Sequence, residues 1–528
     1  MNSTVELSSE QIFSYIVVIV AFFTTLITVF AKRYRLGSVR RLPPGPPGWP
    51  VIGNLAGMIK NRPVHKWMHR VMDEMKTDIA CFRFGNVHVV TVTSKEIARE
   101  ALVDKDEVLA DRPEMYSSGQ MSGGFKTPVC SRYGQQWKKM RKLMTSELMS
   151  PGRLKWLLDA RTAEADNILA YAHSLYKQSS KAVNVRDITM TYAHAVVMRM
   201  MFGRRHFKEE AMDGEMSPME RDHLEATFKG LGCLFSFSVS DYVPFLRGRV
   251  LDEREKMARE ASHLMDKYNE LIIDERIKLW RERDGKKEIG DWLDIFVSLN
   301  DDEGEPLLTP EEIKAECKDI FLATIDNPTN NVEWTLAEML NRPETLERAT
   351  EELDEIVGKD RLAQESDIPK LNYIKACSRE SFRLHPVSPF VPPHVAMEDT
   401  TLAGYFVPKG SHVLVSRVGL GRNPKIWDEP DVFRPERHLG STEVNLLEPE
   451  MRFVSFSTGR RGCIGGKLGT YMTVMLLARL LQGFTWSLPP GSERVELMES
   501  DTKLLMAKPL SASVGPRLAP HMYPKFQR

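Results

Sequence analysis

The hydrophobic pattern of the chain starts with an uncharged run over residues 11–31, whose central residues 16–23 read IVVIVAFF. As a helix, this run is long enough to cross a hydrocarbon layer of roughly 30 Å. Acidic residues precede it and cations follow it, and positive charges stay on the cytoplasmic side of a membrane. The pattern therefore predicts a signal-anchor transmembrane segment over residues 1–31, with a lumenal start and a cytosolic remainder. A cleaved signal peptide is the competing interpretation.

A proline-rich stretch follows the anchor, and residues 43–50 read PPGPPGWP. Proline cannot continue a helix, and its fixed φ angle makes such a stretch semi-rigid. We therefore predict that residues 32–50 form a basic segment and a hinge. A proline-rich ligand for a partner protein is the alternative. Residues 51–528 carry no internal repeat or low-complexity linker and are expected to form one catalytic domain.

Two runs of alternating apolar character meet at Gly85 and Asn86, so residues 81–92 predict a β-hairpin at the edge of a small sheet. Helical patterns fill most of the remaining chain, for example over residues 133–149 and 468–481. The patterns together predict a mainly α fold with a small β-rich lobe.

The clearest helix start is at Thr309, an N-cap that is followed by Pro310 at the first helical position and by Glu312, which completes a capping box. The amphipathic pattern continues to about Leu340 in spite of Pro328. Because a proline inside a helix lacks the N–H for its hydrogen bond, we predict one helix with a kink near Pro328. Two separate helices are the simpler alternative.

Composition limits the class of protein. The chain has 528 residues, of which 42% are hydrophobic, and this is ordinary for a large globular enzyme. Lys plus Arg and Asp plus Glu both number 72, so the net charge gives no support for nucleic-acid binding. The six cysteines show neither a C-x-x-C pair nor zinc-type spacing, which is typical of a protein that faces a reducing compartment.

The most informative cysteine is Cys463, in the glycine-rich loop FSTGRRGCIG of residues 456–465, just before the predicted helix 468–481. Backbone N–H groups of the turn, the start of a helix and Arg461 can supply the positive potential that keeps a thiol ionised. Such a thiolate can bind haem iron, and cysteine ligation favours oxygen activation. A buried structural cysteine is the alternative.

The same loop matches F-x-x-G-x-R-x-C-x-G, the haem loop of the cytochrome P-450 monooxygenases, at every fixed position. The chain therefore resembles that family. The resemblance implies the haem-thiolate (cytochrome P-450) fold, a haem b whose iron takes Cys463 as axial ligand, and Phe456 and Gly459 beside the cofactor. It also implies that electrons from NADPH arrive through a separate flavoprotein reductase.

Haem carries two propionates, which need cationic or donor groups. On the resemblance, Trp137 and Arg141 of a W-x-x-x-R pattern are two candidates, and Arg461 is a third. His394 is a fourth candidate, although a satisfied core histidine is an equally good interpretation of it. On the helix of Trp137, Lys138, Lys139 and Lys142 form either a solvated face or a positive docking patch for the reductase.

Two further segments resemble scaffold elements of the family. Glu380 and Arg383 form its E-x-x-R pair, and Arg437 belongs to the later P-E-R segment. In the family these groups make a buried charge cluster that supports the haem loop, so the resemblance implies that all three residues are structural. The kinked helix matches the family's distal helix, whose acid–alcohol pair delivers protons for oxygen activation. Here the catalytic positions are Asp326 and Asn327, an amide where the alcohol is expected.

The departures from the usual pattern also resemble one subfamily, the plant enzymes that N-hydroxylate amino acids to aldoximes. They share D-N-P at residues 326–328, the P-x-H-V-A stretch around His394, and P-E-R-H at residues 435–438. The resemblance implies two N-hydroxylations with O2 and NADPH, then loss of carbon dioxide and water. It further implies a single-pass protein of the endoplasmic reticulum membrane with a cytosolic catalytic domain, acting in secondary metabolism of the glucosinolate or cyanogenic type.

Three other functions stay open at this point: an oxygen-independent haem-thiolate isomerase or dehydratase, a haem-thiolate enzyme that hydroxylates carbon, and a membrane-anchored haem sensor. The predicted pocket is largely apolar, which favours an aliphatic, methionine-like or phenylalanine side chain. Its expected residues are Phe321, Ile325, Val387, Phe390 and Leu505.

The carboxylate of an amino-acid substrate needs a donor, because burying an isolated charge is costly. The segment before Trp137 is rich in glycine and polar residues, and loops that cover a site often carry such contacts. Arg112 and Lys126 are the two candidates that we single out. For Arg112, a scaffold or haem-edge position is an equally good interpretation.

Overall fold

The computed structural model describes residues 41–178, 182–207, 216–246, 253–282, 288–440, 443–447, 450–500 and 505–527, together with Val17, Ala21 and Thr24. The predicted anchor and residues 32–40 of the basic segment therefore lie outside the described residues, those three positions apart. Within the described ranges, no helix is long and apolar enough to cross a membrane.

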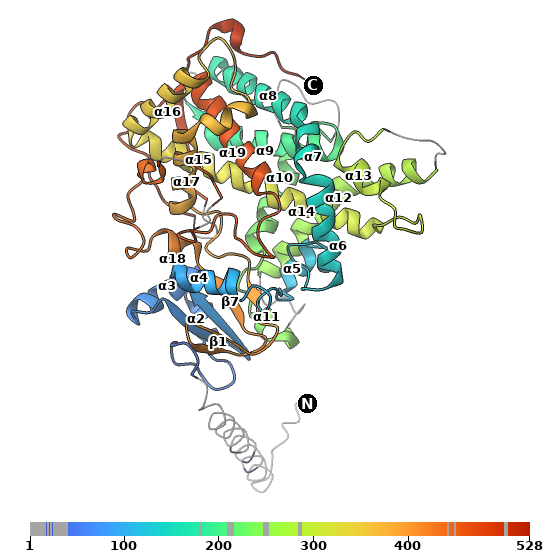
Figure 1. Ribbon diagram of the computed structural model, residues 1–528, viewed down its shortest axis with the longest axis vertical. Coiled ribbons are helices and arrows are strands. Elements are labelled where there is room, and N and C mark those ends of the chain that lie inside the picture. Colours follow the sequence, from blue (N-terminus) through green and yellow to red (C-terminus); the bar gives the residue numbers. More distant parts are fainter. Residues whose placement is uncertain are drawn as a thin grey trace, which may run out of the picture.

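A small β lobe lies at one end of a larger helical body (Figure 1). The main sheet of the lobe has the order β1-β2-β7-β4. Its strands are β1 (Ile79–Phe84), β2 (Val87–Val92), β7 (His412–Val415) and β4 (His394–Val395). β1 and β2 are antiparallel neighbours, which confirms the predicted hairpin, whereas β2 pairs with β7 in parallel. The sheet thus joins the start of the domain to its C-terminal third.

The smaller strands form two further sheets, β3-β9-β8 and β5-β6. Their bounds are β3 (Val183–Asn184), β5 (Thr400–Leu402), β6 (Tyr405–Val407), β8 (Phe484–Ser487) and β9 (Ser511–Pro516). Short helices flank the lobe or link the longer ones: α2 (Leu55–Lys60), α3 (Val64–Glu74), α4 (Lys95–Arg99), α5 (Tyr116–Met121), α7 (Pro151–Trp156), α11 (Val239–Tyr242), α13 (Trp292–Ser298) and α18 (Arg417–Gly421).

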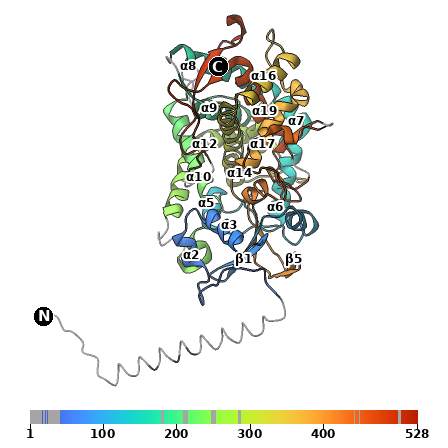
Figure 2. The same ribbon diagram turned by 90° about the vertical axis from the view of Figure 1, so that its left-hand side faces the viewer.

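The long helices build the body around the largest hydrophobic core. They are α8 (Leu158–Gln178), α9 (Val185–Phe202), α10 (Pro218–Cys233), α12 (Glu253–Glu282), α14 (Pro310–Thr324), α15 (Asp326–Leu340), α16 (Pro343–Ile356), α17 (Asn372–Leu384) and α19 (Gly466–Gly483), together with the shorter α6 (Gln135–Leu143). Seen from the side, α14 lies in the middle of the body, among α9, α12 and α17 (Figure 2). The mainly α fold with a small β lobe is confirmed.

α14 begins at the predicted capping box, because the Thr309 side chain accepts from the N–H of Glu312 and the Glu312 side chain binds the Thr309 N–H. The single residue Ile325 separates α14 from α15. Two side chains bind carbonyls at this break: Asn327 Nδ2 donates to the Ala323 carbonyl at 2.6 Å, and Thr329 Oγ1 donates to the Ile325 carbonyl at 2.9 Å. The helix is therefore interrupted near Pro328, as predicted, and the interruption lies just before Asp326.

Residues 43–50, predicted as a hinge, lie against the β lobe. The Cys81 N–H donates to the Pro44 carbonyl at 2.8 Å, and Arg83 Nη2 donates to the Trp49 carbonyl at 2.5 Å. A Cβ atom at Gly45 would lie 1.9 Å from the Cys81 carbonyl oxygen, so only glycine allows this approach. The segment is fixed to strand β1 and is not a free spacer.

Candidate active site

The loop of residues 456–465 forms a tight turn ahead of α19. The Cys463 N–H donates to the Phe456 carbonyl at 2.8 Å, and the Gly462 N–H donates to the Gly459 carbonyl at 3.0 Å. Gly459 has a φ angle of +70°, and a Cβ atom there would lie 2.4 Å from the Leu102 carbonyl oxygen. Glycine is required at this position for both reasons.

The Cys463 side chain is exposed, yet desolvation by the surrounding protein raises the pKa of its thiol. A sulfur that faces an enclosed space can be accessible and still be shielded from bulk water, which accounts for both observations. The Gly465 N–H and the charges of Arg417 and Arg141 act in the opposite direction and lower this pKa. Arg461 is not among the charges that act on this thiol, and its guanidinium instead binds three backbone carbonyls.

Arg461 instead joins a group of buried donors. It donates to the carbonyls of Ala110, Pro128 and Ser131 at 2.6, 3.0 and 2.8 Å, and it lies 5.0 Å above the ring of Trp137. Desolvation lowers its pKa to about 10. The guanidinium therefore stays charged, and fixed in position, inside the protein.

His394 and Arg112 complete this group. His394 is 1% exposed, and its Nδ1 is 2.7 Å from the Leu109 carbonyl oxygen. Desolvation and the charges of Arg112 and Arg461 lower its pKa to about 3, so the ring is neutral at pH 7. Arg112 donates to the carbonyls of Val129, Pro392 and Pro393 at 3.2, 2.8 and 2.8 Å. Arg112 is thus a buried neighbour of the haem-edge candidates, which favours the second interpretation given for it.

Two polar atoms of this group find no hydrogen-bond acceptor or donor among the described residues, namely Trp137 Nε1 and His394 Nε2. Both are buried, and buried polar groups normally have a partner. The Trp137 indole N–H can only donate, and two arginines lie beside it, so these groups fit an anionic ligand. The neutral His394 ring, whose Nδ1–H faces the Leu109 carbonyl, offers Nε2 as an acceptor and donates to that ligand only once the ring is protonated. The carboxylates of a haem, whose iron would be held by Cys463, meet this requirement. Arg141 is also held at this loop, since its Nη1 donates to the Gly462 carbonyl at 2.6 Å.

Phe456 lies half-buried between the loop and two helices. Its ring centroid is 5.6 Å from that of Phe382 on α17. A Cβ atom at Gly469 would lie 3.2 Å from the Phe456 ring, so the first turn of α19 presents a glycine surface to it. The ring thereby fixes the loop against α17 and α19.

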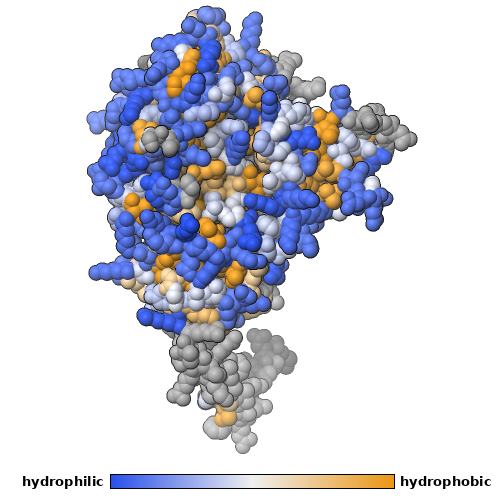
Figure 3. All heavy atoms as spheres, viewed as in Figure 1, coloured by the Kyte–Doolittle hydropathy of each residue, from blue (hydrophilic) through white to orange (hydrophobic). Residues whose placement is uncertain are grey.

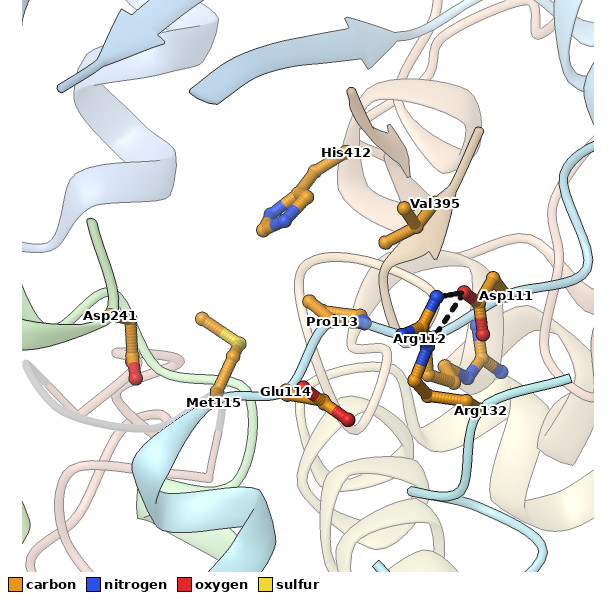
Figure 4. A pocket seen from close by; sticks show the side chains of 9 residues that line it. All are labelled: Asp111, Arg112, Pro113, Glu114, Met115, Arg132, Asp241, Val395 and His412. Atoms are coloured by element: carbon orange, nitrogen blue, oxygen red, sulfur yellow. Dashed lines mark hydrogen bonds and ion pairs between the residues drawn. The ribbon is translucent and has the colours of Figure 1, made fainter. Parts of the chain in front are cut away.

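A cavity of about 230 Å³ opens beside Arg112. Asp241 and Arg132 lie on opposite sides of it in Figure 4, and Arg132 is paired with Asp111 at 2.9 Å. The remaining lining residues are Pro113, Glu114, Met115, Val395 and His412. The cavity lies between the segment after Arg112 and strands β4 and β7, and so borders the donor group from the side of the lobe.

Lys126 does not lie near the helix break. Its Nζ donates to the Gly123 carbonyl at 2.6 Å, and its charge acts on Glu311 at the start of α14. Fifteen residues separate Glu311 from Asp326, about 22 Å along a helix. The expectation that Lys126 meets the substrate carboxylate near the iron is therefore not supported by this position.

The central helix turns one face toward an accessible space. Ala323 is exposed and Asn327 is half-buried, although both belong to a helix in the middle of the body. Asp326, at the start of α15, is 8% exposed. Cys463 is accessible as well. The helix break and the cysteine loop therefore both carry accessible groups, as the two sides of a haem site require.

The sequence prediction chose the wrong helix face for two pocket residues. Phe321 is fully buried and packs against His194, Phe202 and His223 of α9 and α10, with a ring-centroid distance of 4.7 Å to His223. Ile325, one turn later, is also fully buried and lies on the same face. Both side chains therefore point away from Ala323 and belong to the core.

The other three pocket residues divide between two hydrophobic clusters. Phe390 packs in the lobe core, 5.7 Å from the His69 ring and 6.2 Å from the Phe237 ring. Leu505 is 9% exposed and belongs to the main core, and Val387 packs against that core from its edge. Of the five predicted pocket residues, Phe390 thus lies in the core of the lobe, and the other four belong to the main core or pack against it.

The three predicted scaffold residues do come together. Glu380 is fully buried and accepts hydrogen bonds from Arg383 at 2.7 and 2.8 Å and from Arg437 at 2.9 Å. His438 Nε2 is 2.7 Å from the same carboxylate. Arg383 also donates to the Gly421 carbonyl at 2.5 Å. The cluster thus connects α17 with α18 and with the segment that precedes the cysteine loop.

Sequence reasoning missed two residues of the site. Arg417 donates to the Val454 carbonyl at 2.8 Å and to the Phe390 carbonyl at 3.1 Å. Its charge lowers the pKa of the Cys463 thiol. Asp106 accepts from the Arg460 backbone N–H at 3.0 Å and from its Nη1 at 2.9 Å, which holds the loop. Neither residue belongs to a local motif, so only the tertiary arrangement reveals it.

Comparisons with known proteins agree with this geometry. The sequence model of the family described as "Cytochrome P450" matches residues 43–514. The chain is 55% identical over 495 residues to dihomomethionine N-hydroxylase of Arabidopsis thaliana, which covers 92% of both chains. It is 53% identical over 490 residues to tyrosine N-monooxygenase of Sorghum bicolor, which covers 92% of this chain and 88% of that protein. A solved structure of a zebrafish cytochrome P450 with progesterone is similar, with a TM-score of 0.71 and 25% identity over 86% of this chain and 100% of that one. With a haem-thiolate site in place as well, the chain belongs to the cytochrome P450 family.

Proposed function

We propose that the protein converts an α-amino acid with an aliphatic, methionine-like or aromatic side chain to its aldoxime. Two successive N-hydroxylations each consume one O2 and two electrons from NADPH. Loss of carbon dioxide and water then leaves the aldoxime. The observation that carries this proposal is the likeness to two relatives named for amino-acid N-hydroxylation, which covers 92% of the chain in each case.

Separate residues of the site would bind the cofactor, keep the distal helix open and provide an acid. Haem, when bound through Cys463, supplies oxygen activation. Arg461 and Trp137 would supply donors to the carboxylates of the cofactor, and His394 would do so in its protonated form. Asn327 uses its amide to bind the Ala323 carbonyl, so it keeps the helix open at the break without an alcohol. Asp326 remains as the acid next to this opening.

The electron donor is a flavoprotein reductase, and we place its contact at α6. A surface hollow of about 390 Å³ is lined by Trp137, Lys138, Arg141, Lys142, Thr145 and Ser146. None of these residues is acidic, and Lys138 and Lys142 are exposed. Lys139 is excluded from this surface, because it pairs with Glu312 at 2.8 Å. The hollow therefore suits an acidic partner surface close to the cofactor.

The first prediction tests the reaction itself. We expect the full-length protein, reconstituted with a plant-type reductase and NADPH, to form an aldoxime from at least one of the twenty protein amino acids or dihomomethionine. Mass spectrometry identifies the oxime. A product oxidised at carbon would assign a carbon hydroxylase, and a product formed without reductase would assign an isomerase or dehydratase. Spectral binding without any product would assign a sensor.

We also propose that the protein is held at the endoplasmic reticulum membrane by residues 1–31, with the β lobe next to the membrane. At this end of the lobe, Trp49 is 69% exposed and Ile59 is 51% exposed. The short helix η3 (Pro244–Leu246), which exposes Phe245 to 72%, follows α11 beside the β1–β2 turn. Figure 3 shows apolar atoms at this lower end of the molecule. Exposed aromatic side chains of this kind suit a membrane interface.

The second prediction concerns this anchor. Deletion of residues 1–31 is expected to move most of the protein from the membrane fraction to the soluble fraction, because the remaining apolar contacts are few. The spectrum of the reduced, carbon monoxide-bound haem should not change. Sedimentation of both forms from the same cells measures the effect. Complete retention on membranes would assign the attachment to the lobe surface instead.

A further inference from the structure

The most unusual side chain left over from the site is a buried acid on the central helix. Asp319 lies on α14, one turn after Ala315 and seven residues before Asp326. A Cβ atom at Gly123 would lie 3.0 Å from the Ala315 Cβ, so this face of α14 packs against the segment after α5. Residues three, four and seven apart share one face of a helix. Asp319 therefore faces the same segment and the same side as Asp326.

Asp319 has no counter-charge from the protein. It is 6% exposed, and no cation in the described part of the chain contributes to its pKa, which desolvation raises. The neighbouring cation Lys318 turns to the other side and binds Asp266 at 2.8 Å. Glu316, one turn earlier, is 1% exposed, and neither of its carboxylate oxygens has a hydrogen-bond partner among the described residues. A buried acid without a cation is costly unless a ligand supplies one.

A second group points to the same place. Thr127 is fully buried, and within the described ranges its hydroxyl makes no hydrogen bond of normal length. It nevertheless lies close enough to Asp319 to lower the pKa of that carboxyl. The charge of Asp319 also raises the pKa of the Cys130 thiol. An acid and a hydroxyl, both buried, thus lie together where α14 meets residues 122–130.

The position relative to the helix break suits a small substrate. Seven residues correspond to two helical turns, about 10 Å. Ala323, which lies between Asp319 and Asp326 on the same face, is exposed to the interior space. A group held by Asp319 therefore lies beside this space, on the distal side of the haem site, and within reach of a bound amino acid.

We infer that Asp319 binds the α-ammonium group of the amino-acid substrate, with the Thr127 hydroxyl beside it. The inference rests on the proposed function, since it names the residue that recognises the group to be hydroxylated. The carboxylate accepts hydrogen bonds from the ammonium and supplies an opposite charge. Discrimination between an amino acid and the matching acid without an amine follows from this contact, because the latter leaves Asp319 unpaired.

The third prediction tests this contact by spectral titration of the full-length holoprotein. The probes are tyrosine and dihomomethionine, each beside the carboxylic acid that lacks only the amine. Asp319→Asn is expected to weaken binding of the amino acid by at least about 10-fold, as for a lost hydrogen bond to a charged group. Binding of the amine-free acid should be unchanged or tighter. Asp319→Glu should restore most of the affinity for the amino acid. Glu311→Gln, which changes an exposed acid at the start of the same helix, serves as the control with affinity unchanged.

The outcomes separate this inference from the function on which it rests. If the wild type forms no aldoxime and binds no amino acid, both are overturned. If the wild type forms aldoxime and Asp319→Asn keeps its affinity, or loses affinity equally for both ligands, only the role of Asp319 is overturned. Should Asp319→Asn yield no haem protein, Asp319→Ser, which also removes the charge, must show the same selective loss.

Discussion

Cys463→Ala is expected to abolish the thiolate-type spectrum of the reduced, carbon monoxide-bound haem. The loop leaves no other sulfur at this position, and the N–H of Gly465 with the charges of Arg417 and Arg141 favours the thiolate there. Mutation of a group that only hydrogen-bonds to a metal ligand already costs about 10–100-fold in metal affinity or activity. Removal of the ligand itself should therefore lower aldoxime formation by more than about 100-fold.

Cys81→Ala is the matched control for this variant. Cys81 lies half-buried on β1, and desolvation raises the pKa of its thiol, so it is an inert core cysteine. The control should keep both the spectrum and the turnover. Retention of the thiolate-type spectrum in Cys463→Ala would show that another residue binds the iron, and the site would have to be assigned again.

The fold could be predicted where the signal is local. The capping box at Thr309, the hairpin around Gly85 and the loop before Cys463 each depend on a few neighbouring residues. The break before Asp326 followed from the missing N–H of Pro328. These features need no knowledge of distant segments, because backbone conformation and hydrogen bonds within the segment specify them.

Side-chain direction could not be predicted, because it depends on tertiary contacts. Phe321 packs on α9 and α10, a choice of face that the helical pattern alone leaves open. Arg112 binds the Pro392 carbonyl, 280 residues away in the sequence, and Arg417 reaches Cys463 only through the fold. Asp319 lies in an ordinary helical pattern, and its lack of a counter-charge is visible only once its neighbours are known.

Glu380→Gln should cause a large loss of stability. The carboxylate is fully buried, and Arg383 and Arg437 would each lose their opposite charge. Breaking a buried ion pair by removing one member costs about 3–5 kcal/mol. Burial alone would raise the pKa of Glu380, but the hydrogen bonds from Arg383 and His438 outweigh it and lower the pKa from 4.5 to about 2. This difference corresponds to about 3 kcal/mol and agrees with that range.

The pH dependence has a definite sign. Because the pKa of Glu380 is lower in the folded protein, its contribution is present above a pH of about 4.5 and is lost as the pH falls toward about 2. Urea unfolding at pH 7 should show the full difference between wild type and Glu380→Gln, and the difference should narrow below pH 4.5. Glu436→Gln, in the adjacent segment, is the matched control, since Glu436 is exposed and pairs with exposed Arg348, and the glutamine oxygen can still accept the hydrogen bond from the Tyr373 hydroxyl. Surface pairs of this kind contribute at most about 1 kcal/mol. Equal unfolding midpoints for Glu380→Gln and Glu436→Gln would mean that the cluster does not support the haem loop.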